Sequence, residues 1–367
     1  MRGFAVAVMV MGHSVDSVLS LDFRTTELFR LYDAVRGFTA PLFLFISGYA
    51  FSIATEKRWE QYLSLSLPVM KRLMKLIFLL AIGYALHFPF LSFSKILNNT
   101  KPEEYAQFFQ VDVLHCVVVS MLILHSVIIL ARSSRAFARS ILCLTIAIVL
   151  STPLVWAADV GAVFPALVAP YFNQQQPSIF PLFPYAAFLF SGTVAGHFYL
   201  EARRRGEEDQ FFRKMITVCI VAGVAGVVFD LVPISLYPPH DYWKTSPGFF
   251  LVRLSIILLL TAGFYYVRRI PVVIGGQLVR LGQASLLVYV VHLIVVYGSS
   301  ANDGLMQFVG QRLAYPHSVL VGVCVLSGMV LLVHAREYLR TNHYVPLRFA
   351  QIALAGTLLF NFFTKPW

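Results

Sequence analysis

A histidine and an aspartate interrupt an apolar run at the start of the chain, and side chains of these two types can take up and release protons. His13 and Asp16 lie inside the run, and Arg2 stands at its head. If the run is an α-helix, the eleven steps from Arg2 to His13 turn through about 1100° and rise about 16 Å. The two side chains then lie within roughly 20° of one face and about half a bilayer core apart. Asp16 follows at i+3, on the face of His13. Because ionisable groups are costly in hydrocarbon, the pair is predicted to mark a functional site; the alternative is that both residues only bond a neighbouring helix.

Further ionisable residues lie inside other apolar segments. Asp112 and His115 stand three residues apart near the end of one segment, and His292 lies midway along another. Each has a structural alternative, because Asp112 and His115 can satisfy each other at a helix end and His292 can bond a backbone carbonyl. His13, Asp112 and His292 would also suit a proton relay in a membrane carrier. No H-x-x-x-H spacing occurs, so no metal site is predicted.

The composition is that of an integral membrane protein. Of the 367 residues, 58% are apolar and 13% are charged, and the mean hydropathy is positive. Apolar segments of spanning length recur along the whole chain, which predicts an all-α polytopic bundle forming a single domain over residues 1–367. About eleven spans are expected, at residues 3–21, 37–55, 71–91, 112–131, 137–157, 179–199, 214–235, 249–267, 282–300, 318–335 and 347–364.

The net charge of +11 is interpreted as a topology signal rather than as a sign of nucleic-acid binding. If the N-terminus is cytoplasmic, most of the 29 Lys and Arg residues fall in connections on the cytoplasmic side, including Lys71, Arg72, Lys75 and the run 203–205. Inner loops of membrane proteins carry this excess of basic residues, so the sequence predicts a cytoplasmic N-terminus. The four cysteines lie in apolar segments without pairing or metal spacing and are interpreted as small buried hydrophobes.

Six segments between residue 2 and about residue 300 resemble the integral-membrane acyltransferase superfamily. That group includes the family-three acyltransferases, which acylate cell-surface sugars, and heparan-alpha-glucosaminide N-acetyltransferase with its bacterial relatives. The segments are Arg2-x10-His13, the Phe-rich Ser-Gly-aromatic segment 43–49, the basic cluster 71–75, the Val-Leu-polar element 113–115, the Pro-rich segment 180–185 with Gly192 and Gly196, and the Gly-x-x-Ser-x-x-x-Tyr-x-x-His segment 282–292. Relatives usually carry several residues before the Arg-Gly pair, so the resemblance also implies a start upstream of Met1. The heparan-type enzyme has a further His after its first helix, where this chain offers only Asp16, Asp22 and Arg24.

The resemblance implies a reaction and a division of roles. Acetyl-CoA, or another acyl-CoA, would be the donor substrate and would approach from the cytoplasm, with no permanently bound cofactor. Its phosphates would be held by basic residues of the inner face, namely Arg2, Lys71, Arg72 and Arg280. His13 would act as general base or as a transient acyl-histidine, and Asp16 would orient its imidazole. The acceptor, an extracytoplasmic sugar or glycolipid hydroxyl or amine, would meet Arg36, Asp112, His115 and His292.

These observations favour a multi-pass acyltransferase of the cytoplasmic membrane with a glycan acceptor and no nucleic-acid partner. The main alternative is a transporter or proton-coupled carrier in which the intramembrane His and Asp residues form the relay. No internal repeat is evident in the sequence, and the inverted-repeat carriers usually have one. A scaffold without catalytic activity is a third reading, and consumption of a thioester by the purified protein would separate it from an enzyme.

Overall fold

The computed structural model describes residues 1–64, 66–231, 236–267 and 272–365, and the regular structure of these residues is helical throughout. This confirms the all-α fold expected from the sequence. The chain divides into two compact units. Unit 1 comprises Met1–Thr39, Phe88–Phe108 and Arg269–Trp367, and unit 2 comprises Ala40–His87 and Phe109–Arg268. The single domain expected over residues 1–367 stays a prediction.

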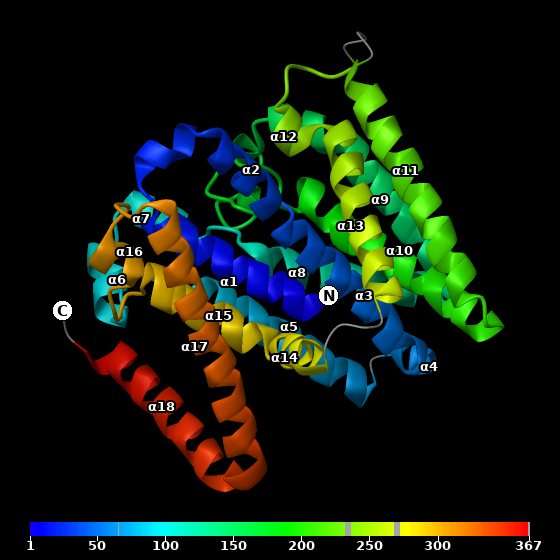
Figure 1. Cartoon of the computed structure of the whole chain (residues 1–367). Helices are drawn as coiled ribbons and strands as arrows, with labels where there is room; N and C mark the ends of the chain where they lie inside the picture. The colour runs from blue at the N-terminus through cyan, green and yellow to red at the C-terminus, as the bar shows by residue number, and fades with distance from the viewer. Residues whose placement is uncertain (65, 232–235, 268–271, 366–367) are drawn as a thin grey trace. The chain divides into compact units, whose positions relative to one another are not determined.

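Unit 1 is built around the first helix. Its elements are α1 (Arg2–Val18), the 3-10 turn η1 (Leu21–Thr25), α2 (Glu27–Arg36), α6 (Phe93–Asn99), α7 (Pro102–Phe108), α14 (Val272–Gln283), α15 (Ser285–Tyr297), α16 (Leu305–Val309), α17 (Tyr315–Asn342) and α18 (Tyr344–Thr364). α1 packs against α14, α15 and α17 (Figure 1). Gly3 permits the close approach to α14, since a Cβ at this position would overlap the carbonyl of Leu278. The apolar run of the first helix is therefore enclosed by helices from the other end of the chain.

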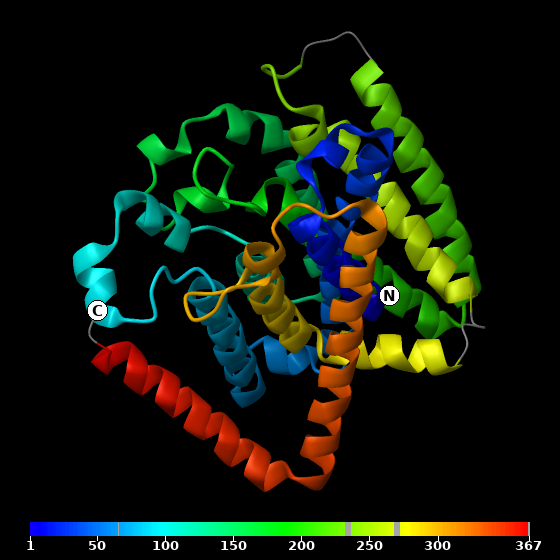
Figure 2. The ribbon, with the colours of Figure 1, turned by 60° about the vertical axis from the view of Figure 1, so that its left-hand side comes forward.

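Both ends of this helical group are tied by hydrogen bonds. The Val18 carbonyl at the end of α1 accepts from the backbone N–H groups of Arg312 and Leu313, 3.1 and 2.9 Å away. α18 turns back from the end of α17 toward α6 (Figure 2), where Ser92 Oγ donates to the Lys365 carbonyl at 2.8 Å. These contacts hold α1 in register with the loop before α17, and α18 with α6.

Unit 2 contains most of the long apolar helices. Its elements are α3 (Thr39–Glu56), α4 (Trp59–Tyr62), α5 (Leu67–Ala85), α8 (Val113–Ala131), α9 (Ser134–Ala157), η2 (Val160–Ala162), η3 (Ala169–Tyr171), α10 (Leu182–Arg205), α11 (Glu208–Leu231), α12 (Tyr242–Thr245) and α13 (Pro247–Tyr266). α11 lies along α13, and α9 along α10 (Figure 1). α3 approaches α10 so closely that a Cβ at Gly48 would overlap the Leu189 carbonyl and one at Gly192 would overlap the Phe45 carbonyl. Small residues permit such close packing between apolar helices.

Seven stretches of the described residues are long and apolar enough to cross a membrane, and a bent pair brings the number to eight. This makes the chain a multi-pass membrane protein. Every predicted span overlaps a helix of the structure, but the expected number of eleven is not confirmed. The helices at predicted spans 3–21, 71–91 and 179–199 are not among the seven: α1 is only 17 residues long, and α5 carries Lys71, Arg72 and Lys75.

The predicted span 282–300 begins at a bend between two helices, and α15 covers most of it. α14 and α15 meet at Ala284 and are bent by 84° relative to each other. Ala284 leaves the helical region of backbone angles, with φ −97° and ψ 17°. The bend redirects α15, which carries His292, along α1.

Candidate active site

The central polar contact of unit 1 joins α1 to α15. His13 Nδ1 lies 3.0 Å from His292 Nε2, and the two rings are stacked with centroids 5.2 Å apart and planes 20° apart. His292 is fully buried, and His13 is partly accessible. Tyr297, five residues after His292, lies edge-on to His13 with ring centroids 5.7 Å apart. The structure therefore brings together two histidines that are separated by 279 positions in the chain.

The hydrogen bonds of this pair determine which nitrogen carries each proton. His292 Nδ1 lies 2.8 Å from the carbonyl oxygen of Val288, which only accepts, so this nitrogen is the donor. In a neutral His292 the Nε2 atom then carries a lone pair, and His13 Nδ1 must donate to it. A neutral His13 is left with its lone pair on Nε2, for which no hydrogen-bond partner is found among the described residues. The chain of bonds thus presents one imidazole nitrogen that is ready to accept a proton.

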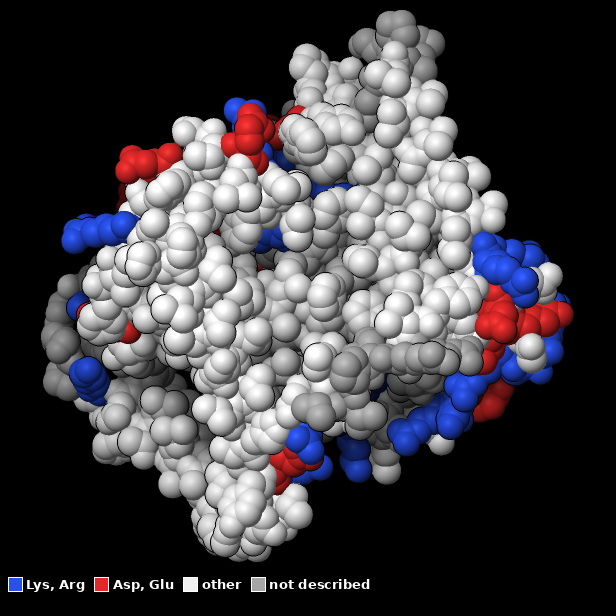
Figure 3. Space-filling model, viewed as in Figure 1, with Lys and Arg blue, Asp and Glu red and all other residues white. Residues whose placement is uncertain are grey.

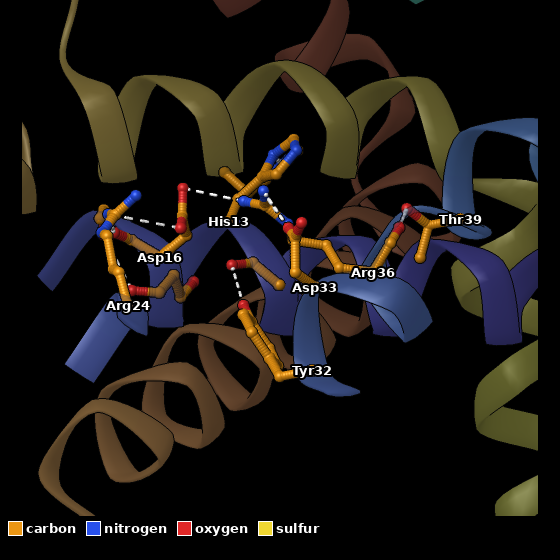
Figure 4. Close-up of polar contacts among 11 residues, drawn as sticks. His13, Asp16, Arg24, Tyr32, Asp33, Arg36 and Thr39 are labelled. Atoms are coloured by element: carbon orange, nitrogen blue, oxygen red, sulfur yellow. Dashed lines mark hydrogen bonds and ion pairs between the residues drawn. The ribbon is translucent and has the colours of Figure 1, made fainter. Parts of the chain in front are cut away.

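Asp16 is engaged by arginines rather than by His13. Its Oδ2 lies 2.9 Å from Arg36 Nη1, and its Oδ1 lies 3.4 Å from Arg24 Nη2, which also donates to the Asp16 backbone carbonyl at 3.0 Å (Figure 4). The expected contact in which Asp16 orients the His13 imidazole is therefore replaced by His292. The physical reason is that two guanidinium groups from η1 and α2 compete for the single carboxylate. The contribution of Asp16 to catalysis stays a prediction.

Helix α2 is held on α1 by its own polar residues. Arg36 Nη2 also pairs with Asp33 Oδ1 at 2.7 Å, and Tyr32 donates its hydroxyl to the carbonyl oxygen of Gly12 at 2.8 Å (Figure 4). The Arg36 side chain lies against Gly12, the residue before His13. Arg36 was expected to contact substrate, and the structure places it beside the predicted base. Sequence reasoning assigned no role to Tyr32 or Tyr297, because neither stands in a recognisable motif.

Asp112 and His115 form a pair at the start of α8, in unit 2. The Asp112 carboxylate accepts from the backbone N–H groups of Leu114 and His115, and His115 Nδ1 lies 2.7 Å from the same oxygen. This is a helix-capping arrangement, the structural alternative considered for the pair. His115 is fully buried against Tyr84, with ring centroids 4.3 Å apart. Burial raises the pKa of the nearby Tyr171 phenol, so this side chain remains a neutral hydrogen-bond donor.

Lys71 and Arg72 line a basic pocket in unit 2. The pocket has a volume of about 500 Å³ and its walls are Arg58, Tyr62, Leu67, Pro68, Lys71, Arg72 and Lys75. Arg72 is fixed by Tyr62, whose hydroxyl lies 2.6 Å from Nη1, and by the ring of Phe51, 4.4 Å from its Cζ atom. Lys71 and Lys75 are exposed one helical turn apart. Among the described residues the lining holds four cations and no carboxylate, a charge distribution that attracts polyanions.

Arg2 and Arg280, the other two basic residues expected to bind the donor, lie in unit 1. Arg2 begins α1 beside Gly282, at the end of α14. Arg280 of α14 lies 2.7 Å from His334 Nε2 and 3.2 Å from Glu337 Oε2, so it ties α14 to α17. The structure thus gives Arg280 a packing role, while its predicted role in donor binding stays a prediction.

The predicted site residues fall into four groups, two in each unit. Unit 1 holds the proton-accepting group, His13, Asp16, Arg36 and His292, and the pair Arg2 and Arg280. Unit 2 holds the basic pocket with Lys71 and Arg72, and the capping pair Asp112 and His115. Chemically, the first group can remove a proton, and the basic pocket can hold phosphates.

The fold defines a multi-pass helical membrane protein, and the histidine pair is the central polar contact of its unit 1. Residues 1–229 match the family model described as heparan-alpha-glucosaminide N-acetyltransferase, catalytic. The chain therefore belongs to this family and is a membrane enzyme of the acetyltransferase type. The match confirms the resemblance drawn from the sequence motifs, and it includes His13, Asp16, Lys71 and Arg72 but ends before His292. A comparison with curated proteins gave no match.

Proposed function

We propose that this protein transfers an acetyl group from acetyl-CoA to an amine or hydroxyl of an extracytoplasmic sugar or glycolipid, in the cytoplasmic membrane and without a permanently bound cofactor. The observation that carries the proposal is the fixed tautomer of His13, whose Nε2 lone pair is left free by the hydrogen bond to His292. The family model supports an acetyl transfer, and its description names a glucosaminide amine as the acceptor in the family. A proton relay in a carrier would need no acyl donor, so the family match disfavours that alternative.

In direct transfer His13 acts as the general base. The acceptor nitrogen or oxygen attacks the thioester carbonyl carbon, and Nε2 of His13 takes the proton that this atom loses. The new C–N or C–O bond forms while the C–S bond breaks, and the CoA thiolate leaves and takes up a proton. The positive charge that develops on His13 is stabilised by the hydrogen bond from Nδ1 to His292, the part that an acidic partner plays in a triad. In the alternative route through an acyl-histidine, the same Nε2 atom is the nucleophile.

Arg36 supplies positive charge beside the base. Its guanidinium is held by Asp16 and Asp33, at 2.9 and 2.7 Å, and these contacts fix its direction. A guanidinium in this place can hold an acceptor oxygen or stabilise the oxyanion of the tetrahedral intermediate. Asp16 then acts through Arg36 rather than through the imidazole. We propose that Arg36 contacts the acceptor in this way.

The basic pocket of unit 2 is proposed to bind the phosphates of the donor. CoA carries several phosphate groups, and the pocket offers the charges of Arg58, Lys71, Arg72 and Lys75 without a neutralising carboxylate. Arg72 is pre-positioned by Tyr62 and Phe51, so little side-chain entropy is lost when it binds an anion. The roles of Arg2 and Arg280 as further phosphate ligands, and of Asp112 and His115 toward the acceptor, remain part of the proposal. His292 was also expected to contact the acceptor, but both of its ring nitrogens are engaged, so we propose that it acts through His13.

The test of the activity is thioester consumption by the purified full-length protein, with acetyl-CoA as donor and glucosamine as a probe acceptor. Release of free CoA thiol that depends on the acceptor supports an acetyltransferase. An intact thioester, together with uptake of the amine into proteoliposomes, would favour a carrier instead.

Donor binding is tested separately with Lys71→Gln. This change removes one exposed cation from the pocket, and we expect CoA affinity to fall by about tenfold, the worth of one charge-assisted hydrogen bond. The measurement is CoA binding to purified protein by calorimetry. Lys57→Gln is the matched control, because Lys57 is exposed between α3 and α4, close to Arg58 in the chain, but does not line the pocket. Equal losses of CoA affinity in the two variants would mean that the basic residues of the pocket only set the orientation of the chain in the membrane.

A further inference from the structure

A second pocket of unit 2 has a mixed-charge mouth and an apolar wall. It has a volume of about 460 Å³ and lies between α9, α10, α11 and α13. Its charged lining residues are Arg205, Lys214, Glu201 and Glu207, at the end of the α10–α11 hairpin. Away from this end its lining is almost wholly uncharged, with residues such as Leu142, Val194, Phe198, Val218 and Leu258. The pocket is therefore charged at one end and apolar over the rest, which would suit an amphipathic ligand.

The pocket opens where lipid is expected. α9, α11 and α13 are among the helices that can cross a membrane. Phe198, Val218 and Leu142 are 48%, 55% and 42% exposed, which is unfavourable in water and favourable in contact with acyl chains. Figure 3 shows Lys, Arg, Asp and Glu gathered at the end of the α10–α11 hairpin, while the length of α11 beyond it carries no charge on this face.

The length of the pocket matches one leaflet. Its lining residues on α10 recur every three or four positions from Ser191 to Arg205, which makes one continuous stripe along the helix. Fourteen residues at 1.5 Å per residue span about 21 Å. Half of a bilayer with its headgroup layer is about 20 Å thick. A lipid with its headgroup at Arg205 would thus reach the uncharged end of the pocket with its acyl chain.

The charges at the mouth point to one kind of headgroup. The neighbouring arginines are engaged, since Arg203 pairs with Glu208 at 3.7 Å and Arg204 with Glu56 at 3.1 Å. Among the described residues no ion pair is found for Arg205, Lys214, Glu201 or Glu207. Two cations and two carboxylates complement a group that carries both a phosphate and an ammonium. They do not suit the phosphates of CoA, which the two carboxylates would repel.

We propose that this pocket binds one phospholipid with an ethanolamine headgroup. Arg205 and Lys214 would hold the phosphate, and Glu201 and Glu207 would accept hydrogen bonds from the primary ammonium. Choline has no N–H to donate, and a glycerol headgroup has no cation, so both are poorer matches. The proposal does not depend on the acetyltransferase reaction.

The test is native mass spectrometry of the delipidated full-length protein, titrated with phosphatidylethanolamine, phosphatidylcholine and phosphatidylglycerol of identical acyl chains. Phosphatidylethanolamine is expected to bind about tenfold more tightly than the other two, because it alone combines the phosphate with an ammonium that can donate hydrogen bonds to the carboxylates. Arg205→Gln with Lys214→Gln should weaken all three lipids about tenfold or more. Glu201→Gln with Glu207→Gln should remove the preference for ethanolamine over choline.

Arg203→Gln is the matched control, since Arg203 lies on the same helical turn but does not line the pocket. Its lipid affinities should equal those of the parent. Ala195→Phe fills the apolar part of the pocket and should weaken all three lipids, and the thermal unfolding of each variant shows whether it is folded. Equal affinity for the three lipids in the parent would contradict the proposal. Displacement of the lipid by acetyl-CoA would contradict it too, and would make this pocket a donor site.

Discussion

The chemistry assigned to His13 depends on which of its ring nitrogens carries the proton. The Val288 carbonyl fixes the tautomer of His292, and His292 in turn fixes that of His13. An amide at position 292 can imitate this arrangement, because its carbonyl oxygen can accept the hydrogen bond from His13 Nδ1. A leucine cannot. Substitution of His292 by Gln and by Leu therefore distinguishes a role in orienting His13 from a role in packing alone.

We predict that His292→Gln retains at least about tenfold more acetyl transfer than His292→Leu. The measurement is kcat for CoA thiol release by the two purified variants, with CoA affinity measured on the same preparations. His292 does not line the basic pocket, so CoA affinity should stay at the parent value in both. Equal kcat values for Gln and Leu would show that His292 serves only to fill space.

At the scale of elements, the close approach of α3 and α10 depends on two glycines. A methyl group at Gly192 would overlap the Phe45 carbonyl, whereas one at Gly263, in the last turn of α13, meets no atom within 4 Å. Ala is favoured over Gly in a helix by roughly 0.5–1 kcal/mol, so the same substitution should have opposite effects at the two positions.

Gly192→Ala is therefore predicted to lower the free energy of unfolding by about 1–3 kcal/mol, the usual cost of overpacking. Gly263→Ala should leave it unchanged or raise it. Both are measured as the shift in Tm of purified protein in detergent. A Gly192→Ala protein as stable as Gly263→Ala would show that the helix pair relaxes easily.

The elements were largely predictable from the sequence, and their junctions were not. Each apolar segment predicted helix and became helix, because length and hydrophobicity act within a segment. The helices on both sides of the bend at Ala284 pack on α1, a long-range contact that no pattern within residues 282–300 reveals. For the same reason the sequence marked His13 and His292 as unusual residues but did not pair them. The competition of Arg24 and Arg36 for Asp16 also required the fold.

At the scale of the whole molecule, the distribution of basic residues predicts the orientation in the membrane. If the N-terminus is cytoplasmic, the connection containing Glu60 faces the cytoplasm and the segment containing Asn98 faces the other side. Both side chains are exposed. This arrangement would present the basic pocket, whose walls include Arg58 and Tyr62, to cytoplasmic acetyl-CoA.

We predict that in intact cells a membrane-impermeant maleimide labels Asn98→Cys but not Glu60→Cys, and that both are labelled after the cells are lysed. The parent protein, which carries four cysteines, provides the background signal. Labelling of Glu60→Cys in intact cells would reverse the orientation and remove the cytoplasmic route for the donor.

The central claim is that Nε2 of His13 accepts the proton of the acceptor. The most direct measurement is the rate of acceptor-dependent CoA release by purified His13→Ala beside the parent, with CoA affinity and Tm determined on the same samples. Loss of a general base costs about 10²–10⁴-fold in rate, so we predict that transfer falls by at least about 10² while CoA affinity and folding are preserved. Transfer at the parent rate by a folded His13→Ala protein would contradict the account.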